Sequence, residues 1–273
     1  MQLQPEVIRE FQDTVWAHYH ANRRDMPWRE QPTPYFVLVS EIMLQQTQVQ
    51  RVLPKFNEFI AHFPTIQLLA AAPLGDVLRV WSGLGYNRRA KFLHQASVKV
   101  VQDLGGILPS TIPELVALPG VGKNTAGAIL AYAYNEPVVF IETNIRTVFF
   151  HHFFADSDKI DDKELTTLIE QTLDLEHPRE WYWALMDYGT YLKQTENNIS
   201  RSRHYTRQSK FEGSRRQVRG AVLRALTQHD SMPESQLRQV ITDKRLPEVV
   251  EELLNEGMIQ RKNKRLYLTD HQA

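Results

Sequence analysis

The sequence predicts a mainly α-helical protein, and three observations lead to this fold class. Apolar residues recur at helical spacing along most of the 273 residues. Prolines and glycines interrupt these stretches at short intervals, as is typical between short helices. The alternation that predicts β-strands occurs near the end of the chain, where residues 259–262 and 265–269 flank an Asn-Lys turn. The chain is long enough for two or three modest domains.

Composition and charge exclude several classes of protein. Hydrophobic residues make up 42% of the chain, which is ordinary for a globular protein. Lys plus Arg (32) equals Asp plus Glu (32), so any nucleic-acid binding must come from local clusters. The chain has no cysteine, which excludes disulfides, thiolate metal sites and cysteine nucleophiles. No apolar run reaches membrane length and the first residues lack the apolar core of a signal peptide, so we expect a cytoplasmic protein.

The first helices place a carboxylate among apolar side chains. Residues 5–22 predict one helix, and the pattern from Tyr35 to Phe63 is helical again. Glu41 lies in this second stretch, in the letters SEIMLQQTQV. Burial of a carboxyl group raises its pKa, so that it can hold a proton at neutral pH. An exposed glutamate on an amphipathic helix is the commoner situation, and the pattern alone does not separate the two.

Further helices over 64–108 are broken by a glycine-flanked turn in the letters GLGYNRRAKFL. The turn presents Tyr86, and Arg88, Arg89 and Lys91 follow it. An aromatic side chain beside three cations suits insertion into a base stack while the cations hold phosphates. The residues alone favour a plainer interpretation, in which the tyrosine covers a helix end and the charges are solvated.

The letters LPGVGKNTAGAIL, residues 118–130, predict a tight turn between two helices. Gly120 and Gly122 allow the backbone to turn sharply and to expose its N–H groups. Lys123 follows at the start of the second helix, where N–H groups and a cation together suit a phosphate oxygen. A simple helix–helix turn explains the same letters equally well.

Three more helices are predicted over 145–155, 163–173 and 181–192. The adjacent His151 and His152 diverge by about 100° on a helix, so we do not expect them to share a metal. The acidic residues in 156–162 lack the glycine and the closing glutamate of a calcium loop, and we interpret them as a solvated helix start.

Residues 201–273 differ from the rest of the chain in their charge and in their predicted elements. Residues 201–219 hold seven Lys or Arg against one Glu, which favours contact with backbone phosphates or a linker between domains. Residues 215–273 then predict three helices and a hairpin, an order that resembles a winged helix. The third helix is rich in glutamate, whereas the hairpin carries four cations. If this segment binds DNA, we expect the hairpin to do so, through Arg261, Lys262, Lys264 and Arg265.

Several motifs together resemble one family. The letters MPWRE, TPYFVLVSEIMLQQTQV, VWSGLGYNRRAKFLHQA, LPGVGKNTAGAIL and ETNIRTV follow one another in the order and spacing of the helix-hairpin-helix DNA glycosylases. The whole 27–200 region resembles the adenine DNA glycosylases of the MutY type. The resemblance implies a two-lobed helix-hairpin-helix glycosylase fold, here with a C-terminal winged-helix-like domain. It divides the chain into a lobe of residues 1–26 plus 138–210, a six-helix lobe of residues 27–137, and a last domain of residues 211–273.

The resemblance also implies roles for single residues. Glu41 falls on the family's general acid, and Glu142 with Asn144 falls on its DGN-type motif, where Glu142 replaces an aspartate. Tyr86 falls on an intercalating tyrosine. The family's DNA contacts map onto Gln45, Gln46, Tyr86, Arg88, Leu118, Gly120, Val121, Gly122, Lys123, Asn124 and Thr125. Asn124 stands where bifunctional relatives carry a lysine nucleophile, so little strand nicking is expected.

Relatives hold an iron–sulfur cluster with four cysteines, a set of ligands that this chain lacks. The aligned positions are Lys193, Ser200, Arg203 and Ser209, so no cluster is expected and no other cofactor is implied. The resemblance leaves room for a monovalent cation at the hairpin. The nucleotide-hydrolase-like domain that reads the opposite base in relatives is missing from this sequence.

Two classes of function stay open at this point. The first is a monofunctional base-excision glycosylase acting as a monomer, cytoplasmic and nucleoid-associated, on double-stranded DNA with a mismatch or damaged base. Adenine opposite 8-oxoguanine or guanine is the expected target, and thymine or uracil opposite guanine is the alternative. The second class is a non-catalytic DNA-binding protein. Such a protein would have no physical need for carboxylates at both 41 and 142.

Overall fold

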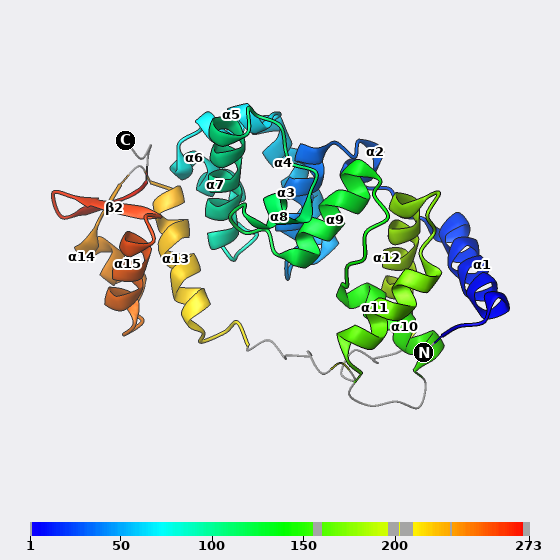
Figure 1. The fold of residues 1–273 in the computed structure, drawn as a ribbon. Coiled ribbons are helices and arrows are strands. Elements are labelled where there is room, and N and C mark those ends of the chain that lie inside the picture. Colours follow the sequence, from blue (N-terminus) through cyan, green and yellow to red (C-terminus); the bar gives the residue numbers. More distant parts are fainter. Residues whose placement is uncertain (1, 155–159, 196–201, 203–209, 230, 270–273) are drawn as a thin grey trace. The chain divides into compact units, whose positions relative to one another are not determined.

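The computed structural model describes residues 2–154, 160–195, 202, 210–229 and 231–269. These residues form two compact units, one of residues 1–41, 110–117 and 121–207 and one of residues 42–109, 118–120 and 208–273. The described part is mainly helical (Figure 1). Its helices in chain order are α1 (Pro5–Asn22), α2 (Pro27–Glu30), α3 (Pro34–Leu44), α4 (Val49–His62), α5 (Ile66–Ala71), α6 (Leu74–Trp81), α7 (Arg88–Asp103), α8 (Ile112–Val116), α9 (Lys123–Tyr134), α10 (Thr143–Phe153), α11 (Asp162–Thr172), α12 (Pro178–Thr195), α13 (Arg215–Thr227), α14 (Glu234–Val240) and α15 (Leu246–Asn255).

Most of the predicted helices are confirmed, although α10 and α12 begin two and three residues earlier than predicted and the short helix α2 lies where a loop was expected. α1 spans Pro5–Asn22, as the periodicity predicted. The single helical stretch expected from Tyr35 to Phe63 is wrong, because α3 ends at Leu44 and α4 begins at Val49. Gln46 lies between them with a φ of 56°, a left-handed conformation that an α-helix cannot contain. Apolar spacing continues across this break, which is why the sequence pattern did not reveal it.

The first unit is built around α12, which lies against α1 and α10 (Figure 1). Phe11 from α1, Phe149 from α10 and Trp181 from α12 meet in its apolar core, and all three are buried. Gly189 allows the close approach of α12 to α10, since a Cβ there would collide with the backbone carbonyl of Asn144. The N-terminus of α10 is thereby fixed against α12, and this position matters for the candidate site.

The second unit packs α4, α5, α6 and α7 around large apolar side chains. Phe56, Phe59 and Trp81 are almost fully buried there, and the rings of Phe59 and Trp81 meet edge to face. Gly120, in the turn between α8 and α9, has a φ of 79°, and a Cβ on it would overlap Phe92 of α7. Glycine at position 120 is therefore needed both for its backbone conformation and for packing.

The end of the second unit combines α13, α14 and α15 with a three-stranded antiparallel sheet. Its strands are β1 (Met232–Pro233), β2 (Ile259–Lys262) and β3 (Arg265–Leu268), in the order β1-β3-β2. β2 and β3 form the predicted hairpin, and Asn263 and Lys264 take positive φ values in its two-residue turn. β1 was not predicted from the sequence. The likeness to a winged helix stays a prediction.

The three predicted domain boundaries likewise stay a prediction, and the two compact units divide the chain at other positions. No helix among the described residues is long and apolar enough to cross a membrane.

Candidate active site

Glu41 lies on α3 in the first unit, and its surroundings favour the protonated form. The residue is partly buried between Ser40 and Ile42, both fully buried. Burial raises the pKa of Glu41 well above its ordinary value of 4.5, and the negative charge of Glu142 raises it further. The positive charge of Arg29 acts in the opposite direction. Glu41 can therefore hold a proton at neutral pH, as the apolar pattern suggested.

Glu142 is the second carboxylate of the same unit, and it stands at the N-cap of α10. Its side chain forms no capping hydrogen bond to the helix backbone, so the carboxylate is not used to start the helix. Burial raises the pKa of Glu142 to about 7, although the charges of Lys193 and Arg146 lower it. Glu41 and Glu142 influence each other, so their two protons are lost in steps that belong to the pair and not to either residue alone.

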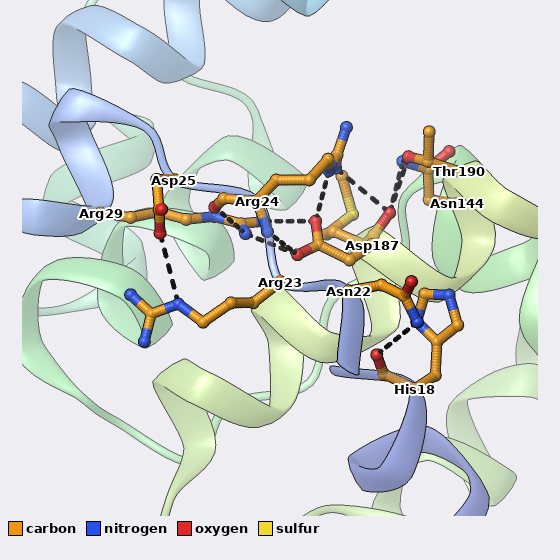
Figure 2. Close-up of polar contacts among 10 residues, drawn as sticks. His18, Asn22, Arg23, Arg24, Asp25, Arg29, Asn144, Asp187 and Thr190 are labelled. Carbon is orange, nitrogen blue, oxygen red and sulfur yellow. Dashed lines mark hydrogen bonds and ion pairs between the residues drawn. The ribbon is translucent and has the colours of Figure 1, made fainter. Parts of the chain in front are cut away.

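A buried ion-pair network supports the site from α12. Asp187 is 3% exposed and receives hydrogen bonds from both Arg24 and Arg29, with the Arg24 Nε–Oδ1 distance at 2.7 Å (Figure 2). Arg29 contacts both carboxylate oxygens of Asp187, at 2.8 and 2.9 Å. Its guanidinium also lies over the Trp183 ring, 5.5 Å from the centroid. Arg29 is thus held in place as the cation that faces Glu41.

Asn144, two residues after Glu142, links α10 to α12. Its Nδ2 donates to the carbonyl of Met186 and to the hydroxyl of Thr190, both at 3.2 Å (Figure 2). Its Oδ1 accepts a hydrogen bond from Lys193 Nζ at 2.5 Å. Asn144 therefore fixes the beginning of α10 and one amine beside Glu142, which gives this residue a positioning role.

Lys193 as a whole is exposed, but its ammonium group is partly desolvated and interacts with the carboxylate of Glu142. This desolvation lowers the pKa of Lys193 to about 8, while the charge of Glu142 raises it. Tyr132 of α9 also interacts with the pair, because burial together with the charges of Glu142 and Glu41 raises its pKa well above the ordinary range. The arrangement offers one proton donor and one ionisable carboxylate, with the charges of Arg29, Lys193 and Arg146 acting on the pair.

The turn between α8 and α9 presents backbone groups, as predicted. α9 begins at Lys123, and Gly122 at its N-cap offers no capping side chain. Leu118 and Val121 are buried and support the turn, while Gly122, Lys123 and Asn124 are exposed. Thr125 is partly buried, and Gln45 donates from Nε2 to the carbonyl of Gly120 at 3.2 Å. The exposed start of α9, with its lysine, suits a negatively charged oxygen.

The second unit brings two other predicted residues to one cleft in left-handed conformations. Gln46 has a φ of 56° and Tyr86 a φ of 48°, and both line a cleft of about 840 Å³. Residues other than glycine rarely adopt such values, and they concentrate where a loop is held for function. Both residues were predicted to contact DNA, and the backbone holds both in strained turns beside the same cleft.

The cations after Tyr86 do not behave as the sequence suggested. Arg89 is 7% exposed and donates to the carbonyls of Met43 at 2.7 Å and Gln45 at 2.6 Å. It is thereby a structural residue that satisfies the carbonyls at the end of α3, and the idea that it holds phosphates is wrong. Arg88 pairs with the Glu256 side chain, and Lys91 donates to the backbone carbonyl of Glu256.

The glutamates of α15 and the hairpin cations also have partners within the second unit. Glu248 and Glu252 accept from Arg215, and Glu252 and Glu256 accept from Arg219. In the hairpin, Arg261 pairs with Glu251 at 2.5 Å, and Arg265 donates to Ser231 Oγ at 2.8 Å. Arg261 is exposed like Lys262 and Lys264, but among the described residues a carboxylate partner is found for Arg261 and for neither lysine.

Comparisons with known proteins decide the family. Residues 39–173 match the model of the HhH-GPD superfamily of base excision DNA repair proteins. The adenine DNA glycosylase of Buchnera aphidicola subsp. Baizongia pistaciae is 38% identical over 175 residues, which are 64% of this chain and 50% of the relative. The adenine DNA glycosylase of Mycobacterium tuberculosis is 44% identical over 142 residues, 51% of this chain and 47% of the relative. The chain belongs to the HhH-GPD superfamily.

Solved structures support the same fold for this HhH-GPD protein. A thermostable thymine-DNA glycosylase superposes with a TM-score of 0.60 at 24% identity, covering 67% of this chain and 86% of that one. This likeness confirms the mainly helical glycosylase fold. The HhH-GPD chain studied here spans about half the length of the curated relatives it matches.

The cluster that the family resemblance suggests would need four cysteines, and this chain contains none. Lys193 donates to Asn144 in place of binding a metal, and Ser200, Arg203 and Ser209 lie outside the described residues. No group of three or more His, Asp or Glu in the described ranges could hold a metal ion. Because the chain also contains no cysteine, its residues do not fit a thiolate-bound iron–sulfur cluster.

Three residues of this HhH-GPD site were missed from the sequence. Arg29 and Asp187 pair across 158 positions of the chain, and no local pattern could join them. The family resemblance places Lys193 at the position of a cysteine and implies no role for its ammonium group. A buried aspartate within the apolar letters WYWALMDYGTYL was the available signal, because such a residue needs a cationic partner.

Proposed function

We propose that this chain is a DNA N-glycosylase that removes adenine mispaired with 8-oxoguanine or guanine, and that it does so without cutting the strand. The observation that carries the proposal is the pair Glu41 and Glu142, two buried carboxylates of one unit, of which Glu142 raises the pKa of Glu41. The names of the relatives favour adenine as the base. Double-stranded DNA is then the partner.

Glu41 is proposed as the general acid. Burial keeps its carboxyl group protonated at neutral pH, so it can give the proton to a ring nitrogen of the departing base. The bond between that base and the sugar C1′ then breaks, and the electron pair of the bond leaves with the base. Protonation makes the base a neutral leaving group.

Glu142 is proposed as the group that stabilises the positive charge on the sugar. Its pKa of about 7 leaves it ionised in a large fraction of molecules at neutral pH, and the charges of Lys193 and Arg146 favour that form. A carboxylate beside an oxocarbenium-like sugar plays the part known from glycoside hydrolysis. Water then adds to C1′, and Glu41 takes up the proton that the water loses.

The DNA-binding residues support the same proposal. The exposed start of α9 with Lys123 suits a backbone phosphate, because unsatisfied N–H groups and a cation attract the same anion. Gln46 and Tyr86 stand in left-handed turns on one cleft and suit entry into the base stack from which the target base has left.

We also propose that folding needs no iron–sulfur cluster. The purified protein should be colourless, and its thermal unfolding should stay cooperative and unshifted after treatment with a chelator. A visible absorbance band that bleaches on reduction would contradict this proposal.

A panel of duplexes with one mismatch each tests the function. Strand scission after alkali reports base release, and scission without alkali reports nicking. We expect alkali-dependent cleavage of the adenine strand opposite 8-oxoguanine and guanine. Cleavage at thymine or uracil opposite guanine would assign the other base, and binding without any release would make the protein a non-catalytic DNA-binding protein.

A further inference from the structure

We propose that the cleft of the second unit binds an unpaired nucleotide of the DNA, with its base stacked on Phe211 and the neighbouring phosphates at Arg51 and Arg224. This inference rests on the proposed function only in taking DNA as the partner. Phe211 and Arg224 lie outside residues 39–173, so the family match assigns neither of them a role. The cleft belongs to the second unit, whereas the carboxylate pair belongs to the first.

Phe211 lines the cleft from a turn whose backbone is held in place. The residue is 54% exposed. Its carbonyl accepts a hydrogen bond from the Ser214 hydroxyl at 2.6 Å. The N–H of Gly213 donates to Gln217 Oε1 at 2.7 Å, and the carbonyl of Gly213 accepts from Arg245 at 3.0 Å. The ring is therefore exposed on a fixed backbone, and little order has to be gained when a ligand binds it.

Tyr86, the second aromatic residue that lines the cleft, differs from Phe211 in its contacts. The guanidinium groups of Arg89 and Arg216 lie 5.3 and 5.5 Å from the centroid of the Tyr86 ring. Among the described residues, no aromatic ring or cation is found against the ring of Phe211. A single exposed phenylalanine is ordinary on a protein surface. An accessible ring in a cleft, however, offers its face to a flat ligand such as a base.

The charges around the cleft favour an anionic ligand. Seven arginines line it against one glutamate, Glu252, which is paired with arginines of α13. Arg51 and Arg224 are exposed, and a carboxylate partner is found for neither within the described ranges. Arg51 donates to the carbonyl of Gly83 at 2.7 Å, which positions the guanidinium without neutralising it. Both groups can therefore meet the phosphate oxygens of a strand.

The size and the lining of the cleft fit a nucleotide. Its volume of about 840 Å³ lies in the range of roughly 300–1,000 Å³ that is typical of sites for small organic ligands. Leu78, Leu84 and Leu223 are buried and add apolar surface to the lining. Aromatic rings beside cations bind single-stranded nucleic acid, because each base has an apolar face and each phosphate a charge.

The ligand is an unpaired nucleotide because a base that is stacked within a duplex cannot offer its face to Phe211. In the proposed reaction, the departure of the target base from the duplex leaves the opposite nucleotide without a partner. That nucleotide is the source of the ligand. Stacking on a phenylalanine accepts any base, so we expect the cleft to hold the nucleotide without reading its identity.

The test compares binding to two labelled duplexes that differ by one nucleotide. One duplex is fully paired, and the other has the same sequence with one additional, unpaired cytosine. Neither contains a mismatched adenine, so the result does not depend on base release. Fluorescence anisotropy with the full-length protein gives the Kd of each. We expect the parent to prefer the unpaired nucleotide by about fivefold or more, and Phe211→Ala to lose this preference.

Three further variants serve as controls. Phe211→Tyr keeps an aromatic face and should keep the preference. Arg224→Gln removes a proposed phosphate contact, so it should weaken binding of the unpaired nucleotide and reduce the salt dependence. Val240→Ala shortens an apolar side chain of the same unit that is 64% exposed and lies outside the cleft, and it should change neither Kd.

The proposal is overturned if the parent binds both duplexes equally, or if Phe211→Ala keeps the preference or weakens both duplexes by the same factor. An excess of a deoxynucleoside monophosphate should not displace the duplex, because it lacks the neighbouring phosphates. Displacement would assign the cleft to free nucleotides and would also contradict the proposal. A protein that shows the preference but releases no base would refute the proposed function alone.

Discussion

Lys193 Nζ lies 2.5 Å from Asn144 Oδ1, and this hydrogen bond places an ammonium beside the carboxylate of Glu142. The position that the family resemblance aligns with a cluster cysteine is occupied here by a cation on α12. The charge of Lys193 favours the ionised form of Glu142.

Replacement of Lys193 by glutamine should change the pH dependence of base release. Excision needs Glu142 ionised, so the rate rises with pH through the pKa of that residue, which is about 7. The glutamine amide can still donate to Asn144 but carries no charge, and the pKa of Glu142 then increases. The acid limb of the pH–rate profile should move to higher pH, and the rate at pH 6.5 should fall by roughly threefold to tenfold.

Single-turnover rates from pH 5.5 to 9 measure this shift, and Lys193→Arg is the matched control. Arginine keeps the charge and should leave the acid limb in place. The groups that remain around Glu142 are Arg146, Glu41 and Tyr132, and their effects are common to all three proteins. A rate that falls equally at every pH in Lys193→Gln would show that the lysine acts only through structure.

Replacement of Asp187 by asparagine should destabilise the protein strongly at neutral pH. The carboxylate is buried and binds Arg24 and Arg29, so its loss leaves a buried guanidinium without its counter-charge, at a cost of about 3 kcal/mol. Burial alone would raise the pKa of Asp187, but the hydrogen bonds and charges of Arg29 and Arg24 lower it below its ordinary value of 3.8. An aspartate with a lowered pKa contributes its full stabilisation above its ordinary pKa of 3.8. This contribution is lost as the pH falls from that value through the lowered pKa of the folded state.

Urea unfolding at pH 7 and at pH 2 measures both effects. The difference in free energy of unfolding between the parent and Asp187→Asn should be largest at pH 7 and should shrink towards pH 2, below the ordinary pKa of the carboxyl group. The exposed pair of Arg9 and Glu6 provides a control, since Glu6→Gln should change stability by less than about 1 kcal/mol at either pH. An equal loss at both pH values would mean that the charge of Asp187 contributes little.

Borohydride should trap little covalent adduct between the protein and DNA. Asn124 is an amide and cannot form an imine, and Arg146 is too basic to act as an amine nucleophile. Lys193 is an amine near Glu142, but its pKa of about 8 leaves it mostly protonated at pH 7. Incubation with an adenine mismatch and borohydride, followed by gel electrophoresis, measures the adduct. A stoichiometric adduct would refute monofunctional chemistry, and its loss in Lys193→Arg would identify the nucleophile.

Local patterns were sufficient for most of the helices, and the resemblance to one family was needed for the two carboxylates. The apolar neighbours of Glu41 on α3 fitted a buried and an exposed glutamate alike, whereas α1 and the hairpin of β2 and β3 follow from spacing and turn residues alone. The resemblance to one family then joined Glu41 to Glu142, which no periodicity could do. The family assignment has since been confirmed by the comparisons.

What could not be predicted depends on contacts between distant parts of the chain. Arg89 looked like a phosphate contact, yet it is buried because the carbonyls at the end of α3 need donors. Nothing in the letters around Arg216 indicates that it meets Tyr86, 130 positions earlier. The sequence around a charged residue does not distinguish a solvated side chain from one that forms an ion pair or lies in a functional site.

The central claim is that Glu41 and Glu142 together release the base, and replacement of Glu142 tests it most directly. Glu142 stands where the family has an aspartate, so its carboxylate reaches further by about one carbon–carbon bond. A displacement of about 1 Å can cost roughly a hundredfold in rate, so Glu142→Asp should lower the rate, not raise it. Glu142→Gln keeps the size of the side chain and removes its charge.

The measurement is the single-turnover rate of adenine release from a duplex with adenine opposite 8-oxoguanine, with the Kd for the same duplex determined in parallel. We predict that Glu142→Gln abolishes release while the Kd stays within about threefold of the parent. If Glu142→Gln releases adenine at the parent rate, Glu142 is not the second carboxylate and the assignment of the active site is wrong.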